Sequence, residues 1–96
     1  MLYAGLCAVM EEARRLVCLP GNDFSWAGWE DETDALREID GLIARLKTGE
    51  LPDPLQLRVL FAPTGPLQEL SISSGWGEAF PALSERFDRE YELAVR

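Results

Sequence analysis

The sequence predicts an α+β fold in which three helices pack on a small antiparallel β-hairpin, in the order α-α-β-β-α and within a single domain of residues 1–96. Two segments near the N-terminus and one at the C-terminus repeat apolar residues at helical spacing. A central stretch alternates apolar and polar residues, as a strand does. Pro and Gly separate these segments, and 96 residues with 47% hydrophobic and 27% charged content suit one globular domain.

The first helix is predicted over residues 4–19 and ends before the helix breakers Pro20 and Gly21. Cys7 and Cys18 fall on nearly the same face of that helix, roughly 16 Å apart, whereas a disulfide needs Cα atoms within about 7 Å of each other. We therefore expect two buried thiols in a reducing, cytoplasmic compartment. The predicted apolar stripe consists of Leu6, Val9, Met10, Ala13, Leu16 and Val17.

Residues 22–30 show no regular period and predict an irregular loop or a single helical turn. The second helix is predicted over residues 31–47, and Gly49 stands where a left-handed residue commonly follows a helix. Its predicted apolar stripe consists of Leu36, Ile39, Leu42, Ile43 and Leu46.

A β-hairpin is predicted next, with strands at residues 55–61 and 67–73 and turn chemistry at residues 62–66. A sheet of two strands is marginal in water, so helices must cover one of its faces. Its free edge is a place where another chain can add a strand. The side chains predicted to share the inner face are Leu55, Leu57, Val59, Phe61, Leu70 and Ile72.

The final helix is predicted over residues 78–94, with Pro81 tolerated in its first turn. Trp76 precedes this helix between Gly75 and Gly77. Its ring either fills the open edge of the core or anchors an interface. The side chains predicted to face inward from the helix are Phe80, Leu83, Phe87 and Tyr91.

Negative charge is concentrated between residues 23 and 40, where seven acidic residues face one base, Arg37, in a chain of net charge −8. The same stretch holds two of the three tryptophans. Charge steers a basic partner toward such a surface, and aromatic side chains supply desolvated anchors. The predicted partner-binding residues are Asp23, Trp26, Trp29, Glu30, Asp31, Glu32, Asp34, Glu38 and Asp40.

Two other interpretations of this stretch stay open. Carboxylates at the start of the predicted second helix satisfy free amide groups and the helix dipole, each contributing about 0.3–1 kcal/mol, and Trp26 and Trp29 can equally be core residues. A metal site is the weaker interpretation, because the chain has no histidine and residues 31–34 lack the spaced ligands and central glycine of a calcium loop.

The composition also excludes several function classes. With 17 acidic and 9 basic residues, the chain should be repelled by nucleic acids and by anionic membranes. Glu11 and Glu12 interrupt the first apolar segment, which therefore predicts neither a signal peptide nor a membrane span. Without histidine no Ser-His or Cys-His pair can form, so we expect no enzyme activity, no cofactor and no metal. A pair of carboxylates held in a cleft is the one remaining route to catalysis.

Two stretches, NDFSWAGWEDETDALREIDGLIARL (22–46) and LFAPTGPLQELSISSGWGEAF (60–80), resemble small acidic proteins of bacteria and their mobile elements that carry no assigned activity. The shared features are an aromatic-acidic segment, a PTGPLQE turn and an SGWG turn, and they cover about half of the chain. In size, acidity and the predicted α+β fold the chain is also similar to toxin-immunity proteins and to phage anti-CRISPR proteins, many of which imitate nucleic acid. The resemblance implies an inhibitor and assigns no site residue.

The leading hypothesis is a non-enzymatic inhibitor, of the toxin-immunity or anti-CRISPR type, whose acidic residues occupy the cationic groove of a basic protein such as a nuclease or a nucleic-acid-binding complex. The protein would act as a monomer or homodimer. The alternative is an oligomerising accessory or structural subunit that uses the hairpin edge and Trp76 as its interface.

Overall fold

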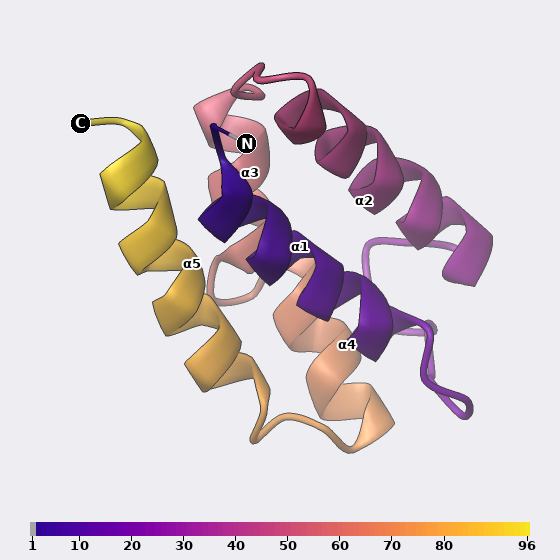
Figure 1. The fold of residues 1–96 in the computed structure, drawn as a ribbon. Helices are drawn as coiled ribbons and strands as arrows, with labels where there is room; N and C mark the ends of the chain where they lie inside the picture. Colours follow the sequence, from indigo (N-terminus) through magenta and orange to yellow (C-terminus); the bar gives the residue numbers. More distant parts are fainter. Residues whose placement is uncertain (1) are drawn as a thin grey trace.

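The computed structural model describes residues 2–96, and within these residues the regular structure is entirely helical (Figure 1). No strand is formed in this part of the chain, so the predicted α+β fold with its β-hairpin is wrong. The helices are α1 (Ala4–Val17), α2 (Glu32–Lys47), α3 (Pro54–Phe61), α4 (Pro66–Ser74) and α5 (Phe80–Ala94).

The three long helices predicted from apolar periodicity are confirmed as α1, α2 and α5. α1 packs against both α2 and α5 and lies between them, while α3 and α4 lie behind α1 in the view of Figure 1. The apolar stripes of these helices meet in one core, in which Met10, Ile39 and Phe87 are among the most deeply buried side chains. Phe87 of α5 also stacks on Phe61 of α3, with 4.2 Å between the ring centroids.

The first predicted strand is the helix α3. Asp53 caps its N-terminus by accepting a hydrogen bond from the backbone N–H of Leu55 (2.9 Å), and Pro54 occupies the first helical position, where its fixed φ favours a helix. The buried residues are Leu57, Leu60 and Phe61, which are spaced as on one helix face. Leu55 and Val59, predicted to face inward from a strand, are exposed instead.

The second predicted strand is the helix α4. Pro66 is its first residue, and the buried side chains Leu67, Leu70 and Ser71 again show helical spacing. Ile72 was predicted to face inward and is 67% exposed. Gly75 ends the helix in the left-handed conformation at φ 87°, which a glycine adopts without steric cost. The turn at residues 62–66 therefore joins two helices rather than two strands.

Candidate functional site

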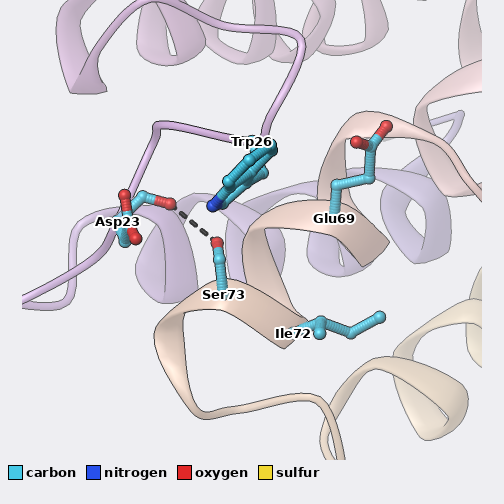
Figure 2. Close-up of a pocket in the computed structure, with 5 residues that line it drawn as sticks. All are labelled: Asp23, Trp26, Glu69, Ile72 and Ser73. Atoms are coloured by element: carbon cyan, nitrogen blue, oxygen red, sulfur yellow. Dashed lines mark hydrogen bonds between the residues drawn. The ribbon is translucent and has the colours of Figure 1, made fainter.

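The loop between α1 and α2 is fastened along α4. At the C-terminal end of α4, the backbone N–H of Asp23 donates to Ser74 Oγ (2.9 Å), and Ser73 Oγ donates to the carbonyl of Asp23 (2.7 Å). Near the N-terminal end of α4, a Cβ on Gly28 would lie 3.9 Å from Pro66 Cβ. The loop thus runs antiparallel to α4 and holds Trp26 above the helix (Figure 2).

Asn22 joins this loop to the rest of the fold. Its Nδ2 donates to the last carbonyls of α1, those of Leu16 and Val17, at 2.9 Å each. Its Oδ1 accepts a hydrogen bond from Trp76 Nε1 (2.9 Å). Trp76 is half-buried against the core, so its polar nitrogen is satisfied while its ring packs. One side chain therefore connects α1, the loop and the segment after α4.

An open pocket of about 470 Å³ lies between this loop and α4 (Figure 2). Its apolar surface comes from Trp26 and Ile72, which are 74% and 67% exposed. The indole stands between the side chains of Asp23 and Glu69, and Ser73 completes the lining. A large aromatic ring kept in water on an anchored loop does not serve the core, and this pocket is the candidate site.

The electrostatics of the pocket are uniformly negative. Hydrogen bonds from Ser25, first from its hydroxyl and then from its backbone N–H, hold the pKa of Asp23 below its usual value of 3.8, so this carboxylate is ionised at neutral pH. Of the nine basic residues, none lies between Arg15 and Arg37 or between Arg58 and Arg86. These are the two segments that supply the pocket.

Three of the predicted binding carboxylates cap a helix or join two helices. Asp31 is the N-cap of α2 and accepts from the backbone N–H of Asp34 (2.9 Å), while Asp34 accepts from that of Glu30 (3.1 Å). Asp40 pairs with Arg14 of α1 through two contacts, at 2.6 and 3.3 Å. Helix capping and helix pairing therefore account for part of the acidic stretch.

The other predicted residues are placed as follows. Trp29 is 5% exposed and belongs to the core, whereas its neighbour Trp26 projects into solvent. Glu32 accepts a hydrogen bond from the thiol of Cys18, and this bond, after burial, raises the pKa of Cys18 above its ordinary value of 9.0. Glu30 is exposed and Glu38 is half-buried on α2.

Glu69, Ile72 and Ser73 were missed by the sequence analysis because they lie on the segment predicted as the returning strand. Two signals in the sequence favour a helix for this segment. One is Pro66 at its first position, and the other is the helical spacing of Leu67, Leu70 and Ser71. On a helix, positions 69, 72 and 73 share a side, since residues three and four apart are neighbours.

Comparison with known proteins found no match: no family model, no curated protein and no solved structure matches this chain. Among residues 2–96, no group of three or more His, Cys, Asp or Glu side chains is arranged to hold a metal ion. None of the helices in the described part of the chain is both long and apolar enough to cross a membrane.

Proposed function

We propose that this chain is a non-enzymatic binding protein that captures a basic protein at the pocket beneath Trp26. The observation that carries the proposal is the state of Trp26, which is 74% exposed on a loop fastened to α4. Tryptophan is enriched among the residues that dominate protein interfaces, because its large surface is desolvated on binding. The anchoring of the loop reduces the ordering cost when a partner docks.

The charge of the surrounding segments selects the sign of the partner. Asp23 and Glu69 flank Trp26, and the exposed Glu30 follows along the same loop. A base-free acidic surface raises the rate of encounter with a cationic protein and disfavours anionic ones. The capping carboxylate of Asp31 adds to the long-range field without being an anchor, whereas the charge of Asp40 is offset by Arg14. Trp29, which is buried, is left out of the proposed contact surface.

The partner class that fits best is a protein whose cationic groove normally holds nucleic acid. An acidic surface can occupy such a groove because it presents carboxylates where phosphates would lie. An inhibitor of a nuclease or of a nucleic-acid-binding complex would act in this way, by analogy with toxin-immunity and anti-CRISPR proteins of similar size and acidity.

A defined basic peptide tests the proposal without knowledge of the natural partner. We would titrate a peptide of alternating lysine, arginine and glycine by calorimetry at roughly 50 mM and 500 mM salt. The double variant Asp23→Asn/Glu69→Gln should bind about fivefold more weakly than the wild type, because each exposed charge pair is worth about 0.2–1 kcal/mol.

The matched control is Glu85→Gln/Asp88→Asn on α5, which removes the same charge away from the pocket. It should change the affinity by less than twofold. Equal losses in the two double variants would mean that only net charge matters, and the proposed site would be wrong.

Self-association is a second candidate function, carried by α3 rather than by the hairpin edge first expected. That edge does not form within residues 2–96, and Trp76 is half-buried. Leu55 and Val59, one turn apart on α3, are 69% and 50% exposed beside a groove lined by Arg58 and Asp88. A second copy docked on this face would remove Leu55 and Val59 from water.

Light scattering across a range of protein concentrations tests this second candidate. A dimer that becomes a monomer in Leu55→Lys would support it, since the new charge would face an apolar contact. A wild-type protein that stays monomeric at all concentrations would reject it.

A further inference from the structure

The pocket beneath Trp26 combines two features that an acidic surface alone does not have. It offers exposed apolar surface from Trp26 and Ile72, and it offers carboxylates on both sides of the indole, from Asp23 and Glu69 (Figure 2). We propose that this pocket receives one arginine side chain of the basic partner, with the guanidinium stacked on Trp26 and its N–H groups bound by Asp23 and Glu69. The inference rests on the proposed function and adds the identity of the residue that the pocket recognises.

The hydrogen-bonding groups of the pocket match a ligand that only donates. The carboxylates of Asp23 and Glu69 accept hydrogen bonds and do not donate them. The hydroxyl of Ser73 donates to the carbonyl of Asp23, so its oxygen faces the pocket as an acceptor. A guanidinium has five N–H donors and no acceptor, whereas an amide, a hydroxyl or a carboxylate would place at least one acceptor against these oxygens.

The apolar surface distinguishes arginine from lysine. A guanidinium is planar and weakly hydrated on its faces, so it stacks on an indole while its edge donates to carboxylates. An ammonium is a compact and strongly hydrated charge, which loses more hydration in reaching the same place. Ile72, on the α4 side of the pocket, adds exposed apolar surface for the aliphatic part of an arginine side chain.

The sequence around the pocket also favours a cationic occupant. No base of this protein lies on either segment that supplies the pocket, so no internal arginine or lysine competes for it from those segments. The backbone of the loop is fixed by the bonds of Asp23 to Ser73 and Ser74. The two carboxylates and the ring are therefore presented together before a partner arrives.

The test uses three short peptides that differ only at the central residue, which is arginine, lysine or citrulline. Citrulline keeps the shape of arginine and loses its charge. The probe is the indole N–H signal of Trp26 in the ¹⁵N-labelled protein, assigned with Trp26→Phe and compared with the signals of Trp29 and Trp76. We expect the arginine peptide to shift the Trp26 signal and to bind at least about fivefold more tightly than the lysine peptide.

Two variants complete the experiment. Trp26→Leu should remove the preference for arginine while leaving a weaker, salt-dependent binding of both cationic peptides. Leu93→Ala, which changes an exposed apolar side chain on α5 outside the pocket, should leave the preference intact. Circular dichroism shows whether Trp26→Leu is folded, and Trp26→Phe provides a milder change that keeps an aromatic face.

The outcomes separate this inference from the proposed function. Equal binding of the arginine and lysine peptides, or binding that leaves the Trp26 signal in place, would overturn the arginine pocket and leave the acidic binding protein standing. Preference for citrulline over lysine would also overturn it, because charge would then play no part. Failure of every cationic peptide to bind would overturn the proposed function and this inference together.

Discussion

Asn22 is the residue on which the geometry of the pocket most depends. Its amide bonds two carbonyls at the end of α1 and accepts the indole N–H of Trp76, which places the following Asp23 beside α4. Turn propensity explained its presence in the sequence, and only the folded chain shows its second role.

We predict that Asn22→Ala destabilises the protein by about 1–3 kcal/mol, because the half-buried indole N–H of Trp76 loses its acceptor. Urea denaturation followed by circular dichroism measures the change. Gln56→Ala, an exposed position on α3, is the control and should stay within about 0.5 kcal/mol of the wild type. If Asn22→Ala also changes the free energy of unfolding by less than about 0.5 kcal/mol, the hydrogen bonds of Asn22 contribute little to stability.

Cys18 gives a second prediction at this scale. Burial and the hydrogen bond to Glu32 raise the pKa of Cys18, so its thiol should react slowly with iodoacetamide at neutral pH and faster only above pH 9.0. In Glu32→Gln the negative neighbour is gone, the thiolate becomes easier to form, and the pH profile should move to lower pH. An unmoved profile would mean that the carboxylate of Glu32 does not act on the thiol.

At the scale of elements, apolar periodicity predicted α1, α2 and α5 but misassigned α3 and α4. In a segment of eight residues a strand pattern and a helical pattern coexist: alternate apolar residues from Leu55 to Phe61 suit a strand, while Leu57, Leu60 and Phe61 suit one helix face. The proline at the start of each segment, Pro54 or Pro66, favours a helix, and the strand prediction did not take this into account. Pairing with α5 through Phe61 and Phe87 then decides which side of α3 is buried.

Gly65 tests the junction between α3 and α4. A Cβ there would collide with the backbone oxygens of Val59 and Ala62, neither of which can move without shifting the helix. Gly65→Ala should therefore cost about 1–3 kcal/mol in the free energy of unfolding. Gly41 on α2 has nothing within 4 Å of the equivalent position, so Gly41→Ala should stabilise by about 0.5–1 kcal/mol. Thermal denaturation of both variants measures the two changes in stability. A change of the same sign in both variants would contradict the prediction.

At the scale of the whole molecule, the charges are unevenly divided. Two bases pair between α1 and α2, Arg14 with Asp40 and Lys47 with Glu11, while the segments that supply the pocket hold acids and no base. The excess negative charge is thus displayed where no internal cation offsets it. Such a distribution favours long-range attraction of a basic partner over stability.

The dependence of stability on pH follows from two carboxyls. Hydrogen bonds from Ser25 lower the pKa of Asp23, and a hydrogen bond from Arg15 lowers that of Glu12. A carboxyl whose pKa falls on folding contributes stability above its unfolded pKa, and this is lost as the pH falls through the folded pKa. The double variant Asp23→Asn/Glu12→Gln should therefore be less stable than the wild type above about pH 5. This loss of stability should shrink as the pH falls toward 3.

Denaturation at several pH values measures this difference, and repulsion among the remaining acids affects both proteins nearly equally. A gap between the two proteins that stays constant from pH 7 to pH 3 would show that neither carboxyl is held in its ionised form by the fold.

Apolar spacing and composition alone predict the three long helices, the loop between the first two, and the concentration of acids and tryptophans within residues 23–40. Apolar periodicity and segment charge are local properties of the sequence, so they can be evaluated without knowing the tertiary contacts. Tertiary structure decided that residues 55–61 and 67–73 are helices, that Trp29 is buried while Trp26 is exposed, and that Glu69 and Ile72 join Asp23 in one pocket. These outcomes depend on contacts between elements that are distant in the sequence. Such contacts decide whether a short segment becomes a helix or a strand, and whether a single aromatic ring is buried.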